Sequence, residues 1–216
     1  MALSVAVLIS GTGSNLEAIL EAVEAGRCDA QVCAVLSDRR TAQGLALAEA
    51  RGIPTHVERL KDHDSREAWD ASLAERVAGY GPDLVVLAGF MKIVGPAMLA
   101  RFPARIVNVH PALLPAFPGT DGPGDALRAG VRISGCTVHV VDAGVDTGPI
   151  LAQAAVPVLP DDDAATLHER IKRAEHRILP GVVNAIASGR IELSSPPRLK
   201  SDPSADSDVL FSPALR

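Results

Sequence analysis

The residues best suited to chemistry stand together in Asn108-Val109-His110-Pro111, at the end of a short apolar run, Ile106–Val109. Residues two apart on a β-strand point to the same side, so Asn108 and His110 would face one side together. Pro111 biases His110 toward an extended backbone, which fixes the direction of the imidazole. An amide can donate to a developing oxyanion, and an imidazole can donate or carry a proton, so the pair predicts a catalytic site. The alternative is a structural histidine whose hydrogen bonds are satisfied in the core.

A second polar segment, Asp142-Ala143-Gly144-Val145-Asp146-Thr147-Gly148-Pro149, follows a long apolar run. Acids in a glycine-rich loop are often turn formers, and this is the stronger interpretation for Asp142. Asp146 could instead pair with His110, which would favour the imidazolium and hold the ring in one orientation. The sequence therefore leaves two roles open for Asp146, a turn former or the partner of His110.

A glycine turn, Ser10-Gly11-Thr12-Gly13-Ser14-Asn15, follows the first apolar run. Ser14 and Glu17 match a capping box with Ser14 as the N-cap, and the free N–H groups of such a helix start suit a phosphate. The motif is not a full dinucleotide fingerprint, because Leu16 stands where a third glycine is expected; Asp38 could still be the ribose-binding acid. The alternative is a turn that binds nothing. Ligands gather at strand ends of this kind, which favours phosphate binding.

Short apolar runs alternate with longer amphipathic segments along the chain. Strands are expected at 3–9, 31–37, 55–57, 83–88, 106–109, 133–141 and 150–156. Helices are expected at 14–25, 43–51, 65–79, around 126–129 and at 164–188. This alternation predicts a single α/β domain with a Rossmann-like, doubly wound, mostly parallel sheet. We expect residues 1–193 to form it and residues 194–216, rich in Ser, Pro and Asp, to be a poorly ordered tail.

The composition narrows the class of protein. Of the 216 residues, 47% are hydrophobic but only 3% aromatic, so the core must be built from Val, Leu, Ile and Ala, as in a parallel sheet covered by helices. The net charge of −5 and the lack of Lys/Arg runs argue against nucleic acid or an anionic membrane as a partner. No signal peptide or membrane-length apolar stretch is apparent, so a cytoplasmic location is expected. Three cysteines without CxxC spacing predict free thiols, and no metal site is expected.

Taken together, several segments resemble the folate-dependent phosphoribosylglycinamide formyltransferase family. They occur in the family's order between Leu3 and about Leu193: Gly11–Asn15, Asp64–Glu67, Ala88–Ile93, Asn108–Pro115, Asp142–Pro149 and Glu169–His176. The string Asn-x-His-Pro-x-Leu-Leu-Pro is highly specific to enzymes that use formyl-folate, and Gly-x-Gly-Ser-Asn narrows the choice to the glycinamide branch. The resemblance implies transfer of the formyl group of 10-formyltetrahydrofolate to the amine of 5-phosphoribosylglycinamide. The products would be the N-formyl ribonucleotide and tetrahydrofolate, in de novo purine (IMP) biosynthesis.

The resemblance also assigns roles to individual residues. The catalytic residues would be Asn108, His110 and Asp146. The phosphate and ribose of the substrate would be bound by Gly13, Ser14, Asn15 and Glu175. The folate would be bound by Arg66, Met91, Lys92, Ile93, Val94, Asn108 and Asp142. The formyl-folate would be a co-substrate, and no metal would take part.

Some of these residues also have a plain structural explanation. Without the resemblance, Glu175 would be a solvated charge on a helix, and Met91 and Ile93 would be core residues. Thr137, expected to face the site from the long strand, is a candidate supporting hydrogen-bond partner.

The chain departs from the family after Pro118-Gly119, where a histidine is usual within about two residues. Asp121 stands near that place, and it could add negative potential beside His110 or reduce activity. The extra glycines and proline of residues 119–125 would loosen the loop.

Several rival interpretations remain. Methionyl-tRNA formyltransferase would need an additional C-terminal domain and a basic RNA-facing surface. Formyltetrahydrofolate hydrolase would need an N-terminal regulatory domain. None of these features is apparent in the sequence, so both enzymes are disfavoured. An NAD-linked oxidoreductase is disfavoured by the missing third glycine. A non-catalytic nucleotide-binding module is disfavoured by Asn108, His110 and Asp146. We expect a monomer or homodimer whose partners are its small-molecule substrates.

Overall fold

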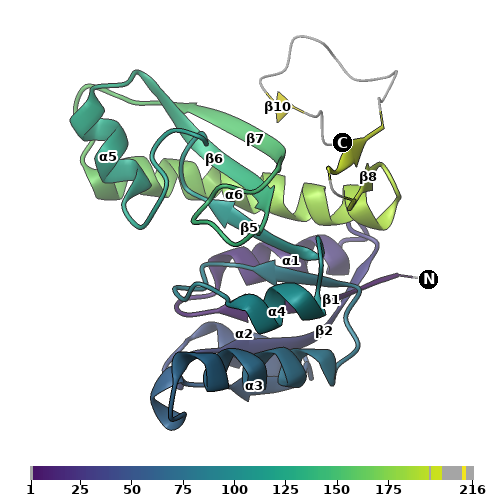
Figure 1. Cartoon of the computed structure of the whole chain (residues 1–216). Coiled ribbons are helices and arrows are strands. Elements are labelled where there is room, and N and C mark those ends of the chain that lie inside the picture. The colour runs from purple at the N-terminus through teal and green to yellow at the C-terminus, as the bar shows by residue number, and fades with distance from the viewer. Residues whose placement is uncertain (1, 195, 201–210, 213–216) are drawn as a thin grey trace. The chain divides into compact units, whose positions relative to one another are not determined.

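The computed structural model describes residues 2–194, 196–200 and 211–212 (Figure 1). The chain divides into two compact units, Met1–Asn108 and Val109–Arg216. Each unit carries part of the predicted site.

The first unit is built on parallel strands. They are β1 (Leu3–Ile9), β2 (Ala30–Ser37), β3 (Thr55–Val57), β4 (Leu84–Leu87) and β5 (Ile106–His110), whose last two residues belong to the second unit. Their order is β5-β4-β1-β2-β3, and every neighbouring pair is parallel. Five consecutive residues of β1, Val5 to Ile9, are fully buried. Such a continuous apolar run is typical of a strand covered on both faces.

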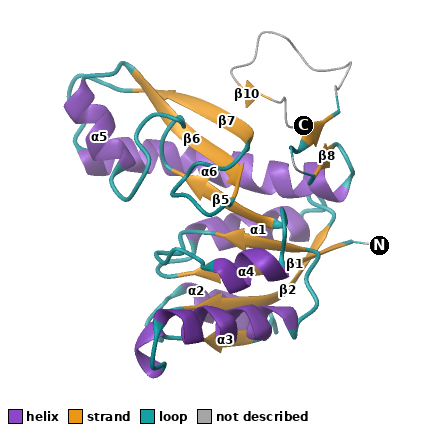
Figure 2. Ribbon diagram, viewed as in Figure 1, coloured by secondary structure: helices purple, strands orange, loops and turns teal. Residues whose placement is uncertain are grey.

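The helices of the first unit cover both faces of these strands. They are α1 (Ser14–Glu24), α2 (Gly44–Glu49), the 3-10 helix η1 (Leu60–Asp62), α3 (Arg66–Ala78) and α4 (Pro96–Arg101). The chain moves from β1 outward to β3 and then returns across β1 to β4. Because βαβ crossovers are right-handed, the reversal places α1 and α2 on one face and α3 and α4 on the other (Figure 2). The switch point between β1 and β4 is where such sheets bind ligands.

The second unit centres on an antiparallel hairpin of β6 (Ile133–Val140) and β7 (Ile150–Pro157). Helix α6 (Ala164–Ala187) packs against both strands and against α5 (Gly122–Ala129). A capping box of Asp163 and Thr166 starts α6, which continues through Pro180. The strand β10 (Phe211–Ser212) pairs antiparallel with β7, and β8 (Ile191–Glu192) pairs antiparallel with β9 (Arg198–Leu199).

The prediction of an α/β fold with a mostly parallel sheet is confirmed, and each expected strand and helix is present. The short helix α4 was not predicted. Most of the expected tail lies outside the described residues, so the boundary at residue 193 stays a prediction. Among the helices of the described residues, none is long and apolar enough to cross a membrane.

Candidate active site

The imidazole of His110 lies at the end of β5, with only 3% of the residue exposed. Its Nε2 lies 2.8 Å from the carbonyl oxygen of Phe117, and its Nδ1 lies 3.3 Å from Oδ2 of Asp146. A carbonyl and a carboxylate can only accept hydrogen bonds, and a neutral ring has a single N–H. Only the doubly protonated ring can therefore donate to both groups at once. The predicted pairing of His110 with Asp146 is present, whereas the contact with Phe117 was not foreseen.

Asp146 is mostly buried and joins three groups of the second unit. Besides His110, its Oδ2 accepts a hydrogen bond from the N–H of Gly119 at 2.9 Å, and its Oδ1 lies 3.5 Å from Nε2 of His139. Burial alone would raise the pKa of Asp146, but the bond from His139, the N–H of Gly119 and the charges of His110 and His139 hold this pKa below its usual value. The carboxylate is therefore ionised at neutral pH and can stabilise an imidazolium.

The two partners of His110 share an unusual backbone conformation. Phe117 has a φ of 58° and Asp146 a φ of 55°, in the left-handed region that non-glycine residues seldom adopt. Each such residue costs on the order of 1–3 kcal/mol, and residues of this kind cluster at functional sites. Both accept from the same imidazole, so the strained positions coincide with the predicted chemistry.

His139 is a site residue that the sequence reasoning missed. It lies on β6 with 2% of the residue exposed, and its Nδ1 lies 3.0 Å from the carbonyl oxygen of Val140. Asp146 thus stands between two imidazoles. The signal that could have revealed His139 is a histidine near the end of a long strand, just before the acidic loop. Within the described residues, no group of three His, Cys, Asp or Glu side chains is arranged to hold a metal ion.

Thr137 does not face an open site, because it is fully buried. Its hydroxyl donates to the carbonyl of Ala112 at 2.7 Å and accepts from the N–H of Leu114 at 3.0 Å. Gln153 donates to this hydroxyl at 3.0 Å and to the carbonyl of Leu114 at 2.8 Å. The expectation that Thr137 faces the site is therefore wrong. It holds the segment that follows His110, which is an indirect supporting role.

The segment after Gly119 is ordered rather than loosened. Asp121 is the N-cap of α5 and accepts from the N–H of Gly124 at 3.2 Å. A Cβ on Gly124 would lie 2.3 Å from Oδ2 of Asp121, so a side chain there would displace the capping carboxylate. Arg128 donates to Oδ2 of Asp121 at 3.0 Å. The expectation of a loose loop is wrong, because these residues form the first turn of a capped helix, and Asp121 has a structural explanation.

Asp142 forms a turn, as its neighbours in the sequence indicated. Its Oδ1 accepts from the N–H of Gly144 at 3.0 Å and from the hydroxyl of Thr147 at 2.7 Å. A Cβ on Gly148 would lie 1.8 Å from the carbonyl oxygen of Val140, so the backbone passes too closely for any side chain there. Side-chain bonds and close backbone packing therefore shape the loop that carries Asp146.

Glu175 lies on α6, and only 4% of it is exposed. Burial first, and then the negative charge of Glu175, raise the pKa of the Cys136 thiol on β6, so the carboxylate lies close to that strand. The interpretation of Glu175 as a solvated helix charge is therefore wrong. A buried carboxylate is costly, which is consistent with a specific role.

In the first unit, α1 begins one residue earlier than the capping box predicts. Its N-cap is Gly13, with a φ of 81° and no side-chain cap, so the prediction of Ser14 as N-cap is wrong. A Cβ on Gly13 would lie 2.6 Å from Cα of Gly44, and this close approach together with the positive φ explains the glycine. Ser14 and Asn15 occupy the first turn of α1, where backbone N–H groups suit an anion.

Asp38 links the strand ends of the first unit. Its Oδ1 accepts from the hydroxyl of Ser10 at 2.5 Å, and its Oδ2 lies 3.6 Å from Nε of Arg39. The Ser10 hydroxyl in turn accepts from the N–H of Met91 at 2.7 Å. Both carboxylate oxygens of Asp38 thus have a partner, which gives this buried acid a structural role.

Two apolar side chains predicted to contact folate are exposed. Met91 is 64% exposed and Ile93 57% exposed, so the alternative of core packing is wrong for both. Val94, at 4% exposed, is a core residue. Arg66 donates to the carbonyl of Ile93 at 2.6 Å. The segment after β4 therefore presents apolar side chains to solvent at the switch point, as a ligand-binding segment would.

Asn108 is half-buried, two residues before His110 on the same strand. The structure thus places Asn108 and His110 on the same strand, β5. Lys92, which lies between the two exposed apolar residues, is half-buried.

Comparison with known proteins gives one consistent result. A family model described as formyl transferase matches residues 3–183. A phosphoribosylglycinamide formyltransferase of Mycobacterium tuberculosis (strain CDC 1551 / Oshkosh) is 55% identical over 182 residues, which are 84% of each chain. That of Escherichia coli (strain K12) is 41% identical over 191 residues, covering 88% of this chain and 90% of the relative. The crystal structure of glycinamide ribonucleotide transformylase 1 from Symbiobacterium toebii matches with a TM-score of 0.89 at 47% identity, covering 93% of this chain and 95% of that one. The chain belongs to the formyl transferase family.

Proposed function

We propose that this chain transfers the formyl group of 10-formyltetrahydrofolate to the amine of 5-phosphoribosylglycinamide, in de novo purine biosynthesis. The observation that carries the proposal is the imidazole of His110, which lies between the Phe117 carbonyl and the ionised Asp146 at the end of β5. Relatives at 55% and 41% identity carry the name phosphoribosylglycinamide formyltransferase, which specifies the transferred group and its acceptor.

The chemistry is acyl transfer without a protein nucleophile. The free amine attacks the formyl carbon, a C–N bond forms, and the carbonyl oxygen becomes an oxyanion. The amide of Asn108 and an N–H of His110 donate to this oxyanion, and each such donor lowers the barrier by about 2.7–4 kcal/mol. The bond from the formyl carbon to N10 then breaks. The amine loses a proton, and N10 of the departing tetrahydrofolate gains one, through water.

The hydrogen bonds of His110 add a detail to this mechanism. Both ring nitrogens already face acceptors, Phe117 at Nε2 and Asp146 at Nδ1. The oxyanion therefore takes the place of the Phe117 carbonyl as the acceptor for Nε2–H. Asp146 keeps its partner at Nδ1 throughout, so it holds the ring in one orientation.

The remaining roles follow from the chemistry of each group. In the first unit, the backbone at Gly13, Ser14 and Asn15 binds the substrate phosphate, because helix N-termini favour anions. In the second unit, the buried carboxylate of Glu175 accepts from the ribose hydroxyls.

The folate contacts come from two segments with different chemistry. In the first unit, the exposed side chains of Met91 and Ile93 cover the apolar part of the folate, while Arg66 and Lys92 attract its carboxylates. In the second unit, the loop that starts at Asp142 contributes backbone groups to the pterin. Val94 supports the first segment from the core.

The test is a formyl-transfer assay with 10-formyldideazafolate, followed by absorbance of the released folate product. We expect release that requires 5-phosphoribosylglycinamide. Release without the ribonucleotide would identify a hydrolase. No release, together with a nicotinamide-dependent signal, would identify an oxidoreductase and overturn the proposal.

His110→Ala tests the residue that carries the proposal. We expect turnover to fall by at least about 100-fold, with an unchanged circular dichroism spectrum. The matched control is His168→Ala, a change on α6 in which the same side chain is lost far along the chain from the motif. Near-normal turnover of His110→Ala would remove His110 from the mechanism.

A further inference from the structure

Residues 90–95, called here the β4–α4 segment, lie between β4 and α4 and form neither a helix nor a strand. They include Met91 and Ile93, the exposed apolar residues proposed to contact folate. The first half of the segment is held at the end of β1, because the N–H of Met91 donates to the Ser10 hydroxyl at 2.7 Å. Backbone outside a helix or a sheet finds its hydrogen-bond partners in other elements. The second half therefore depends on a partner of its own.

The carboxylate of Asp70, on α3, is the partner of the second half. Its Oδ1 accepts from the N–H of Gly95 at 2.6 Å, and its Oδ2 accepts from the N–H groups of Ala97 at 2.7 Å and Met98 at 3.4 Å. Gly95 is the N-cap of α4 and has no capping side chain, so Asp70 supplies the cap from another helix. A Cβ on Gly95 would lie 2.6 Å from Cγ of Asp70, so any larger residue there would push the carboxylate away.

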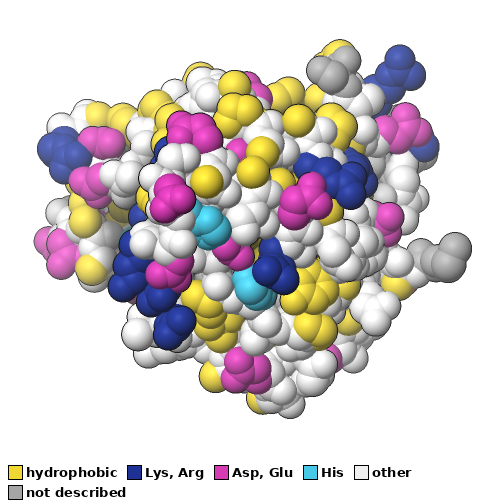
Figure 3. All heavy atoms as spheres, turned by 60° about the horizontal axis from the view of Figure 1, so that its bottom comes forward, with side chains coloured by type: hydrophobic (Ala, Val, Ile, Leu, Met, Phe, Trp, Pro, Cys, Tyr) yellow, Lys and Arg dark blue, Asp and Glu magenta, His cyan; other side chains and the backbone are white. Residues whose placement is uncertain are grey.

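Asp70 is a buried charge. Only 2% of it is exposed, whereas the acidic side chains that Figure 3 draws lie at the surface. Removing a carboxylate from water is costly unless its oxygens accept hydrogen bonds. Bonds from N–H groups to an ionised acceptor are among the stronger ones in proteins. Asp70 therefore fixes the backbone at Gly95, where the β4–α4 segment ends.

Two neighbours of Asp70 on α3 contact the same segment. Arg66 donates to the carbonyl of Ile93 at 2.6 Å. The ring of Trp69 stacks on that of Phe90, with 6.4 Å between the centroids and 14° between the planes. Residues three and four apart lie on one face of a helix, so Arg66, Trp69 and Asp70 can hold the segment together.

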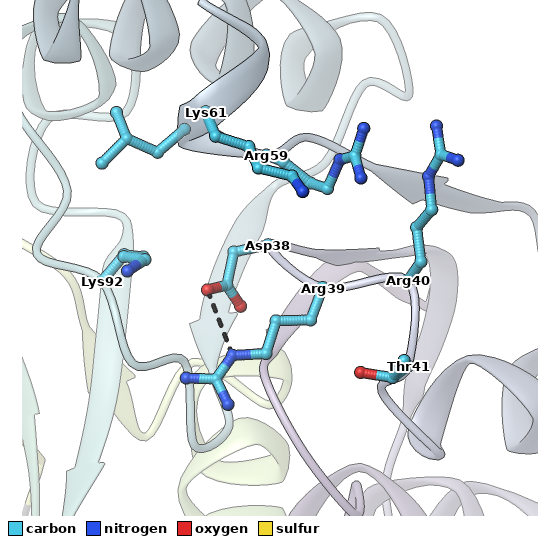
Figure 4. A pocket seen from close by; sticks show the side chains of 8 residues that line it. Asp38, Arg39, Arg40, Thr41, Arg59, Lys61 and Lys92 are labelled. Carbon is cyan, nitrogen blue, oxygen red and sulfur yellow. Dashed lines mark ion pairs between the residues drawn. The ribbon is translucent and has the colours of Figure 1, made fainter.

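The backbone of the segment sets the directions of its side chains. Met91 and Ile93 are exposed, whereas Lys92 between them is half-buried and lines the pocket drawn in Figure 4, across from Arg40. This alternation requires a single backbone conformation. Releasing the end at Gly95 would free the two apolar side chains from the positions in which a folate can contact both.

We propose that Asp70 is a positioning residue for folate binding, which acts by fixing the backbone that carries Met91 and Ile93. The inference rests on the proposed use of formyl-folate and adds to it a buried residue that acts through the backbone. When only a fraction of the molecules has the binding-competent conformation, the apparent Kd rises by the inverse of that fraction. The phosphate-binding turn at Gly13 and the imidazole of His110 belong to other elements, so their functions should change little.

The test measures kcat and both KM values of Asp70→Asn with 10-formyldideazafolate and 5-phosphoribosylglycinamide. Asparagine keeps the size of aspartate but turns an NH2 group toward a backbone N–H. We expect the KM for the folate to rise about fivefold to fiftyfold, while kcat and the KM for the ribonucleotide change less than about threefold. Destabilisation alone would reduce the amount of folded enzyme, which lowers kcat and leaves both KM values unchanged.

A second variant and a control accompany this measurement. Gly95→Ala disrupts the same contact without removing the charge of Asp70, so it should raise the folate KM in the same way, and it carries the test if Asp70→Asn does not fold. The matched control is Asp83→Asn. The carboxylate of Asp83 accepts from the N–H of Ser4 at 3.0 Å, just before β4, at the opposite end of that strand. This control should leave both KM values unchanged.

Four results would overturn the proposal: an unchanged folate KM in a folded Asp70→Asn or Gly95→Ala variant, an equal rise of both KM values, a fall in kcat alone, or the same rise of the folate KM in Asp83→Asn. Calorimetric titration with the folate analogue separates this inference from the proposed function. Folate binding by the unaltered protein without any turnover would contradict the proposed function. The Kd values of the variants would then still decide the role of Asp70.

Discussion

Replacing Thr137 by valine tests whether the buried hydroxyl holds the segment that follows His110. Valine keeps the shape of threonine but removes three hydrogen bonds, with Ala112, Leu114 and Gln153. A typical buried hydrogen bond contributes about 0.5–1.5 kcal/mol, so three would give about 1.5–4.5 kcal/mol. The loss should lie in the lower half of this range, about 2–3 kcal/mol. This is because the Leu114 N–H still reaches the Ala112 carbonyl at 3.2 Å, and Gln153 still donates to the Leu114 carbonyl at 2.8 Å.

The measurement is urea denaturation of Thr137→Val beside Thr41→Val, an exposed control expected to change the free energy of unfolding by less than about 0.5 kcal/mol. Turnover of Thr137→Val should also fall about tenfold or more, because small displacements of a catalytic group are costly. A destabilisation equal to that of the control would refute the hydrogen-bond reasoning. Normal turnover in a clearly destabilised variant would show that this segment does not position His110.

Three further predictions concern acids with different roles. Asp146→Asn should lower kcat by at least about 100-fold with an unchanged circular dichroism spectrum, and a fall of less than threefold would exclude the proposed role of Asp146 in turnover. Burial opposes ionisation of Glu58, but bonds from two histidines and a serine hold its pKa below the usual value. The ionised Glu58 therefore contributes fully to the free energy of unfolding above its unfolded pKa of 4.5. This contribution is lost as the pH falls through the lower pKa of the folded state. Glu58→Gln should therefore cost about 1–3 kcal/mol at pH 7 and flatten the loss of stability in acid, and an unchanged acid slope in denaturation curves would contradict this. Asp121→Ala should cost about 0.5–2 kcal/mol through loss of a helix cap and leave kcat unchanged; a tenfold lower kcat would give Asp121 a direct catalytic role.

Periodicity located most strands and helices because buried parallel strands and amphipathic helices leave strong patterns. The start of α1 was misplaced, because the Ser14 and Glu17 pattern is local. The N-cap is Gly13 instead, and its backbone lies close to Gly44, which stands thirty-one positions later in the sequence. The helix α4 was missed because only Met98 among its six residues is buried, so it has no clear apolar period.

The site was predictable where its residues belong to one motif, as with Asn108 and His110. His139 was missed because its role depends on a contact with Asp146 that joins a strand to the loop after it. Alternation alone could not show where the Thr137 side chain points, because its hydroxyl donates to the carbonyl of Ala112, about twenty-five residues earlier in the chain. Burial of Glu175 likewise follows from the packing of α6 on β6 and β7, which a single helix pattern does not reveal.

The central claim is that the formyl carbon moves intact to the amine of the ribonucleotide. The most direct test supplies folate labelled with ¹³C in its formyl group and analyses the ribonucleotide by mass spectrometry. The proposed chemistry predicts a product that has gained one labelled formyl group in place of a hydrogen, in amounts equal to the folate released. With His110→Ala this product should form at least about 100-fold more slowly. Labelled formate with an unchanged ribonucleotide would contradict the claim and make the protein a hydrolase.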